Sequence, residues 1–193
     1  MVTKQTNLLE VDWSQIPAPQ DDGAAAHLVG MTVPPISLRA TNDTAVVLSE
    51  LRGRTVVFAY PRTGEPGKIS LVEDWDMIPG ARGCTPQTCA FRDLFAELKA
   101  AGAKQVFGLS TQSNAYQTEM ASRLHLPFPV LSDEALELTE ALRLPVMEVA
   151  ELTLIKRMAL VIDDAKITQL FYPVFPPDRN AGDVLEWLQA NPV

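Results

Sequence analysis

Short apolar runs separated by polar turns recur along the chain from residue 36 onward, and several are rich in β-branched and aromatic residues. Runs of this kind are typical of buried strands of a sheet that is covered on both faces. The pattern predicts strands within TVVFAYP (55–61), KQVFGLST (104–111), PFPVLSD (127–133) and MALVID (158–163).

Between these runs, apolar residues return every three or four positions, which is the spacing of amphipathic helices. This spacing predicts helices over residues 90–101, 113–124, 134–142 and 181–190. Strands that alternate with helices are typical of a layered α/β domain. The alternation breaks in residues 154–174, where two strand-like runs flank the turn-like sequence DDAK and predict an antiparallel hairpin.

Two segments lack a regular pattern. Residues 1–30 are rich in proline and polar residues and predict an irregular N-terminal lead-in, with one short helix near 24–28, ahead of a single domain over 31–193. Residues 62–83 form a loop inside that domain and lead directly to Cys84. Loops beyond roughly 12–15 residues are uncommon in compact domains and are often functional.

Composition and charge restrict the class of protein. The chain has 193 residues, 47% of them hydrophobic and 21% charged, which is normal for a globular protein with one core. Its net charge of -8 comes from interspersed residues, so we expect no nucleic-acid partner. No apolar run reaches the roughly 18 residues that cross a bilayer, and the N-terminus lacks a signal-like pattern. We therefore expect a cytoplasmic protein without a membrane anchor.

Both cysteines lie in GCTPQTCAFRD (83–93), after a glycine-containing turn. Thr85 is a good N-cap and Pro86 suits a first helical position, so the sequence predicts a helix that begins at Thr85. Cys84 then lies where unpaired N–H groups and the helix dipole favour an anion. Thiolates are nucleophiles, which makes Cys84 a candidate for catalysis.

Cys89 lies five positions further along the predicted helix, where the two Cα atoms would be roughly 8.5 Å apart. A disulfide needs Cα atoms within about 7 Å. The pair would therefore not be bonded in the folded helix, and a disulfide would require its first turn to unwind.

Two other interpretations of the cysteines need to be considered. An isolated cysteine is often an inert, buried apolar residue. A metal site needs three or four ligands, and the two histidines, His27 and His125, lie far from the cysteines in the sequence. We expect no metal.

The motif around the cysteines resembles that of the peroxiredoxins, and most of all their bacterioferritin-comigratory-protein or PrxQ-like branch, whose helix start reads approximately P-G-C-T-x-Q-x-C-x-x-R-D. The order of strands and helices from about residue 30 to about residue 174 is similar as well. The positions that match the motif are Gly83, Cys84, Thr85, Gln87, Cys89, Arg92 and Asp93.

The resemblance implies a thioredoxin-like α/β fold, in which helices flank a central mixed sheet, and a thiol-dependent peroxidase. Cys84 corresponds to the peroxidatic cysteine, which becomes a sulfenic acid, and Cys89 to the resolving cysteine of an intramolecular disulfide. Arg157 falls where the family keeps the arginine that stabilises the thiolate and polarises the peroxide. Gly83 and Thr85, beside Cys84, are expected to help bind the peroxide.

The resemblance also sets expectations for partners. The substrate would be hydrogen peroxide or an organic hydroperoxide, and a dithiol protein such as thioredoxin or glutaredoxin would reduce the oxidised enzyme. No metal or organic cofactor is expected. A monomer and a homodimer are both compatible with resolution inside one chain.

The chain departs from the family pattern ahead of Cys84, where Ala81 occupies the position of the usual threonine and Met77 that of the usual proline. An insertion also separates Tyr60-Pro61 from the motif. We hypothesise that the hydroxyl of Thr63 replaces the missing threonine, and that Trp75 and Met77 form an apolar wall.

Two other functions stay open at this point. A thiol–disulfide oxidoreductase would normally carry C-x-x-C, whereas this chain has four residues between its cysteines. A redox-sensing binding module with little turnover is the alternative outside enzymology.

Overall fold

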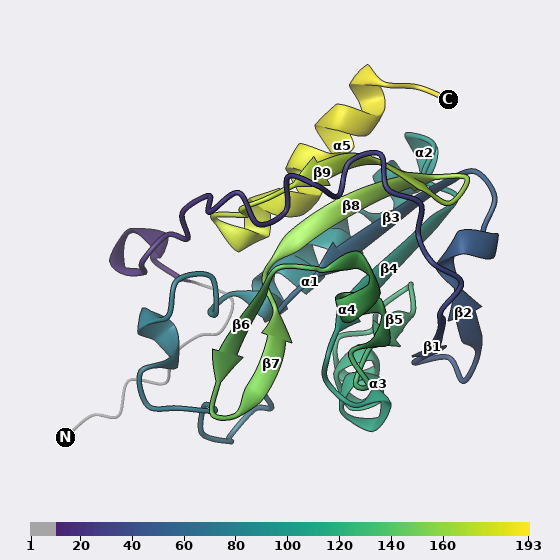
Figure 1. The fold of residues 1–193 in the computed structure, drawn as a ribbon. Coiled ribbons are helices and arrows are strands. Elements are labelled where there is room, and N and C mark those ends of the chain that lie inside the picture. Colours follow the sequence, from purple (N-terminus) through teal and green to yellow (C-terminus); the bar gives the residue numbers. More distant parts are fainter. Residues whose placement is uncertain (1–10) are drawn as a thin grey trace.

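The computed structural model describes residues 11–193, in which a seven-stranded sheet is ordered β2-β1-β5-β4-β3-β8-β9 (Figure 1). A separate hairpin pairs β6 with β7. The strands are β1 (Ser37–Ala40), β2 (Ala45–Val47), β3 (Arg54–Ala59), β4 (Gln105–Ser110), β5 (Val130–Ser132), β6 (Val146–Val149), β7 (Leu152–Ile155), β8 (Met158–Asp163) and β9 (Lys166–Phe171).

The sheet is mixed, as expected. Strand β4 runs parallel to both β3 and β5, whereas β8 is antiparallel to β3 and to β9. All six residues of β3 are buried. Val56 and Phe58 face one core cluster and Val57 and Ala59 the other, because successive side chains of a strand point to opposite faces. The four predicted strands and the predicted hairpin are therefore confirmed.

The longer helices cover the two faces of this sheet (Figure 1). They are α1 (Cys84–Asp93), α2 (Phe95–Ala100), α3 (Asn114–Arg123), α4 (Glu137–Leu142) and α5 (Asn180–Ala190). The 3-10 turns are η1 (Trp13–Gln15), η2 (Leu48–Glu50), η3 (Trp75–Met77) and η4 (Pro177–Arg179). Buried residues of α1, α2, α3 and α5 belong to one core cluster, and those of α4 and of the segment before β1 belong to the other.

Several predicted boundaries were wrong. The helix expected over residues 90–101 is the end of α1 followed by α2, with a break at Leu94, whose φ of -98° and ψ of 11° are not helical. The helix expected from residue 134 begins at Glu137. Near residues 24–28 the chain forms hydrogen-bonded turns rather than a helix, with the N–H of Leu28 donating to Ala25 O.

Residues 25–30 of the predicted lead-in pack against the domain. Ala25 and Leu28 are fully buried in the core, and the N–H of Gly30 donates to Ile167 O in β9. Residues 1–10 lie outside the described part, and the domain boundary near residue 31 stays a prediction. No helix within residues 11–193 is long and apolar enough to cross a membrane.

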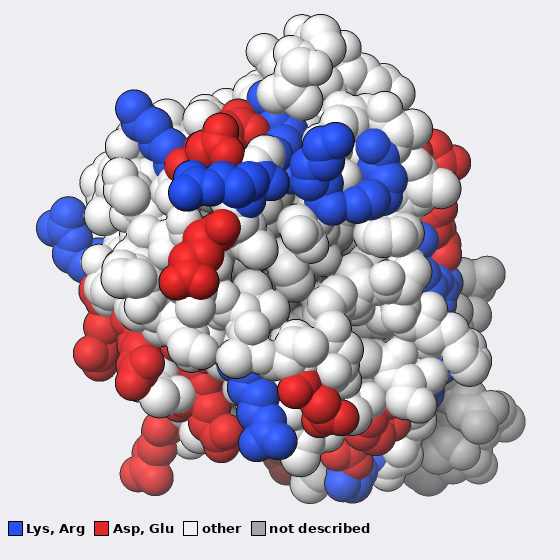
Figure 2. Space-filling model, turned by 90° about the vertical axis from the view of Figure 1, so that its right-hand side faces the viewer, with Lys and Arg blue, Asp and Glu red and all other residues white. Residues whose placement is uncertain are grey.

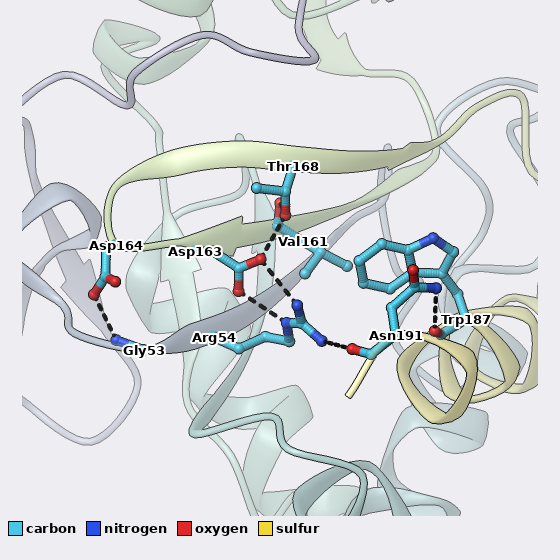
Figure 3. Close-up of polar contacts among 8 residues, drawn as sticks. All are labelled: Gly53, Arg54, Val161, Asp163, Asp164, Thr168, Trp187 and Asn191. Atoms are coloured by element: carbon cyan, nitrogen blue, oxygen red, sulfur yellow. Dashed lines mark hydrogen bonds and ion pairs between the residues drawn. The ribbon is translucent and has the colours of Figure 1, made fainter. Parts of the chain in front are cut away.

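The start of β3 is joined to its neighbours by an ion pair between the buried Arg54 and the partly buried Asp163 (Figure 3). Arg54 donates from Nε and Nη2 to the two carboxylate oxygens of Asp163, at 2.8 and 3.0 Å. Its Nη1 donates to the carbonyl of Asn191, and its guanidinium lies 5.1 Å from the ring centroid of Trp187. Thr168 donates to the same carboxylate. This cluster joins β3, β8, β9 and the end of α5.

The surface in Figure 2 carries charges of both signs: Lys and Arg cross its upper part with Asp and Glu beside them, and most of the charged side chains in the lower part are Asp and Glu. This face agrees with the interspersed charges of the sequence.

Candidate active site

Cys84 is the first residue of α1 and is buried, with 3% of its surface exposed. The expected N-cap at Thr85 was wrong, because the preceding residue, Gly83, turns the chain into the helix with a φ of +103°. Only glycine fits at this point: an added Cβ would lie 2.5 Å from Pro177 Cγ and 2.8 Å from the ring of Trp13. Cys84 therefore lies inside the first turn, where the helix dipole still favours an anion.

Arg157 directly precedes β8 and reaches the sulfur of Cys84. Its Nη2 lies 3.3 Å from Cys84 Sγ, and the arginine is only 2% exposed. The register of β8 with β3 pairs Met158 with Ala59, so Arg157 lies at the end of β3 that leads into the loop over residues 62–83. The sheet thus brings together two residues that are far apart in the sequence.

The backbone before α1 holds the guanidinium in place. Nη2 of Arg157 also donates to the carbonyls of Gly80, Ala81 and Arg82, at 3.1, 3.3 and 2.9 Å. The thiol of Cys84 donates to the same Ala81 carbonyl at 3.5 Å. Main-chain oxygens therefore orient the guanidinium of Arg157, and one of them belongs to Ala81, which occupies the position of the family threonine.

Gln87 and Asn180 extend this contact, and neither was among the predicted site residues. Gln87 Oε1 accepts from Arg157 Nη1 at 2.6 Å, and Gln87 Nε2 donates to Asn180 Oδ1 at 2.9 Å. All three side chains are buried. Gln87 could have been predicted as a site residue because it belongs to the sequence motif. The sequence around Asn180 contains no pattern that indicates a role in the site.

Cys89 lies further along the same helix, buried and not bonded to Cys84. Burial raises the pKa of its thiol, so the group is protonated at neutral pH. Because both cysteines are in one continuous helix, the spacing of about 8.5 Å expected for their Cα atoms applies. A bond between them requires the start of α1 to unwind.

A cavity of about 100 Å³ opens at Cys84 and is lined by the predicted residues Thr63, Gly83 and Thr85. Thr63 is buried, and its hydroxyl donates to Gln112 Oε1 at 3.1 Å. The structure therefore brings Thr63, Gly83 and Thr85 together at Cys84, whereas Cys89 is not among the lining residues. The role of each in peroxide binding stays a prediction.

Three neighbouring side chains from the long loop differ in their placement. Trp75 lines the cavity, whereas Met77 is 60% exposed and is not among the lining residues. The expected apolar wall thus consists of Trp75 without Met77. Arg82 lines the cavity as well, but its guanidinium pairs with Asp76.

Neither histidine is among the residues that line the cavity at Cys84. His27 Nε2 lies 2.9 Å from Leu142 O, and His125 follows α3 with a φ of +52°. Within the described residues, no group of three or more His, Cys, Asp or Glu side chains is placed to hold a metal ion.

Comparison with known proteins identifies the family. The family model described as Redoxin matches residues 28–185. Peroxiredoxin Q, a chloroplast protein of Oryza sativa subsp. japonica, is 34% identical over 165 residues, which cover 83% of this chain and 66% of the relative. The chain thus spans just under two thirds of that relative. Peroxiredoxin Q of Sedum lineare is 33% identical over 83% of this chain and 77% of its own length.

The fold leads to the same family. The crystal structure of peroxidoxin BcpB from Mycobacterium tuberculosis superposes with a TM-score of 0.68 at 27% sequence identity, and the match covers 86% of this chain and 98% of that one. The mixed sheet flanked by helices is therefore the thioredoxin-like fold expected from the sequence. The chain belongs to the Redoxin family, and within it to the peroxiredoxins of the Q type and their bacterioferritin-comigratory relatives.

Proposed function

We propose that the protein is a thiol-dependent peroxidase with Cys84 as its nucleophile. The observation that carries the proposal is the 3.3 Å contact between Arg157 Nη2 and Cys84 Sγ in a buried site. A buried guanidinium attracts a negative charge strongly, and no carboxylate within residues 11–193 forms an ion pair with Arg157. The thiolate of Cys84 is the anion that meets this charge.

In the proposed reaction, the Cys84 thiolate attacks the terminal oxygen of a hydroperoxide. A sulfur–oxygen bond forms as the oxygen–oxygen bond breaks, and the departing oxygen leaves as an alcohol or as water after taking up a proton. The sulfur loses two electrons and becomes a sulfenic acid. Arg157 stabilises the negative charge as it moves from sulfur to the departing oxygen.

Cys89 then condenses with the sulfenic acid and releases water, which leaves an intramolecular disulfide. The start of α1 has to unwind for this step, because the folded helix separates the two residues. A dithiol protein, thioredoxin or glutaredoxin, would return both cysteines to thiols. No metal or organic cofactor takes part.

Residues around the cavity have supporting roles in this proposal. Gly83 and Thr85 line it beside the first turn of α1, whose N–H groups are suited to hold a peroxide oxygen. Thr63 lines the same cavity and is proposed to replace the family threonine. The protein would act as a monomer or a homodimer in the cytoplasm. That location stays a prediction, because the plant relatives named above are chloroplast proteins.

Intact mass after one equivalent of hydrogen peroxide tests the proposal. The native protein should lose two hydrogen atoms, and Cys89→Ser should instead gain one oxygen or two. Cys84→Ser, the matched control, should show neither change and should consume no peroxide. Full peroxidase activity of Cys84→Ser would disprove the assignment of the nucleophile.

A further inference from the structure

Arg62 lies at the start of the long loop and lines the cavity at Cys84 as well as a larger one of about 360 Å³. The two cavities also share Thr63, Gly64, Ser70 and Trp75, so they adjoin. The larger cavity, which we call the loop groove, is lined by Arg62, Thr63, Gly64, Glu65, Lys68, Ile69, Ser70, Leu71, Trp75 and Tyr116. A ligand in the loop groove would therefore lie next to the cavity at Cys84.

Among the described residues that line the loop groove, one positively charged side chain has no ion-pair partner. Lys68 and Glu65, which both line it, form an ion pair with each other. Arg62 has no ion-pair partner among residues 11–193, and its guanidinium lies 5.0 Å from the ring centroid of Tyr116. The groove thus presents an arginine fork with free donors, which binds a carboxylate well.

A network of hydrogen bonds fixes the base of this arginine. The N–H and the hydroxyl of Thr63 donate to Gln112 Oε1 at 2.9 and 3.1 Å. Gln112 Nε2 and the Tyr116 hydroxyl both donate to Thr63 O, at 3.2 and 2.9 Å. The backbone next to Arg62 and the ring beneath its guanidinium are therefore ordered before a ligand arrives, which favours binding.

The rest of the groove is suited to an apolar chain. Ile69 is 96% exposed, and Leu71 and Trp75 line the groove beside it. A third cavity of about 480 Å³, which Arg62 and Tyr116 also line, contains Glu134 and Glu151, which repel anions. An anionic group would therefore occupy the loop groove rather than this third cavity.

We propose that the loop groove binds the carboxylate end of an amphipathic organic hydroperoxide, with Arg62 as the residue that recognises the anion. The peroxide end would lie at Cys84 and the apolar chain against Trp75 and Leu71. One unbalanced positive charge matches a carboxylate, whereas a phosphate monoester carries a charge of about -1.5 to -2 at neutral pH. This inference rests on the proposed peroxidase function and names its substrate class.

The test compares kcat/KM for a fatty-acid hydroperoxide below its micelle concentration with kcat/KM for its methyl ester. We expect the wild-type protein to prefer the acid by about tenfold at low salt, and this ratio to fall as ionic strength rises. Arg62→Gln should bring the ratio close to one, whereas Arg62→Lys should retain part of the preference. Arg39→Gln is the matched control, because Arg39 is an exposed arginine in β1 that lines neither cavity, and it should keep the wild-type ratio.

Equal reaction of acid and ester with the wild-type protein at low salt would overturn the proposal, whether or not the variants fold. A preference that survives Arg62→Gln would overturn the role of Arg62. A stronger preference for a lysophosphatidic acid hydroperoxide would reject a carboxylate as the ligand. Hydrogen peroxide, assayed in parallel, separates these outcomes from failure of the peroxidase function, because it has no anionic end.

Discussion

Two buried arginines lie at opposite ends of the same pair of strands. Arg54 begins β3 and is 6% exposed, whereas Arg157 precedes β8 and is 2% exposed. Arg54 is held by the two oxygens of Asp163 (Figure 3). Arg157 contacts uncharged oxygens and the sulfur of Cys84, and within residues 11–193 it has no carboxylate partner.

The difference separates an arginine that stabilises the fold from one that is available for chemistry. A buried charge is costly unless an opposite charge lies beside it. The carboxylate of Asp163 neutralises Arg54 as long as it is ionised. In the proposed reaction the compensating charge for Arg157 is the Cys84 thiolate, which oxidation removes. Because no carboxylate in the described structure neutralises Arg157, its positive charge stays available to the sulfur of Cys84.

Replacing Arg157 should have the largest effect, and on the rate rather than on the fold. In Arg157→Met we expect the rate of reaction with hydrogen peroxide to fall by about 100-fold or more, because the transition state loses the cation that contacts the sulfur. Stopped-flow kinetics measure this rate, and circular dichroism checks the fold. Arg54→Met removes the same charge and serves as the control. A loss of only a few fold would mean that Arg157 is structural, like Arg54.

Arg54→Met should show the opposite result. Removing the guanidinium leaves the Asp163 carboxylate unpaired, and we expect the free energy of unfolding to fall by about 2–3 kcal/mol, because that carboxylate is partly solvated. Urea unfolding measures the change. A second substitution, Asp163→Leu, should recover part of the loss. The peroxide rate per folded molecule should stay at the wild-type value, and a marked decrease would contradict the separation of the two sites.

Gln87→Leu should have a smaller effect on the site. The change leaves Arg157 Nη1 without its acceptor and Asn180 Oδ1 without its donor. We expect the peroxide rate to fall by about tenfold, which corresponds to about 1.4 kcal/mol. The rate with hydrogen peroxide measures the effect, and Gln169→Leu, at a partly buried glutamine in β9, is the control. An unchanged rate would show that the backbone carbonyls alone position Arg157.

The smallest expected effect is on the pH dependence of stability, which should differ between the sites of Arg54 and Arg157. The hydrogen bond from Arg54 lowers the pKa of Asp163 below its ordinary value of 3.8. Its contribution to stability is therefore complete above that value and is lost as the pH falls through the lower folded-state pKa. Asp163→Asn should be less stable than the wild type by about 1 kcal/mol at pH 7, and this difference should vanish in acid.

Urea midpoints measured from pH 7 down to the acid transition follow this difference. Arg157→Met offers the contrast, because no carboxylate in the described structure pairs with Arg157. The stability difference between that variant and the wild type should not change over the carboxyl range. A constant difference for Asp163→Asn would mean that the Arg54 pair contributes nothing to stability.

The central strands were predictable because they are buried on both faces, and their sequences are therefore short apolar runs. The hairpin of β6 and β7 was not, because Ala150 and Glu151 form its turn with φ values of +48° and +63°. Residues of this kind rarely adopt a positive φ, so the sequence has no turn signal at that point. The turn at Asp164 and Ala165, in the predicted hairpin, also has positive φ values but begins with the more typical aspartate.

The site was predictable only where the motif is local. Periodicity placed Cys84 at a helix start but could not place Arg157 beside it, since that contact depends on the register of β8 with β3. The family resemblance supplied that pairing. The exact helix start was missed because Gly83 turns the chain with its backbone, and Thr85 forms no cap. Asn180 joins the site through the packing of α5 on α1, which no local pattern encodes.

The tight packing at Gly83 has an optical consequence. The ring of Trp13 lies over this glycine, its Nε1 donates to Asp178 Oδ2 at 3.1 Å, and its edge meets Phe175. Forming the Cys84–Cys89 disulfide unwinds the helix start that Gly83 leads into, so it must also disturb the environment of this indole. If the proposed disulfide forms, tryptophan emission would therefore provide a label-free readout of each catalytic cycle, and Trp13→Phe would identify the part of the signal that comes from this ring.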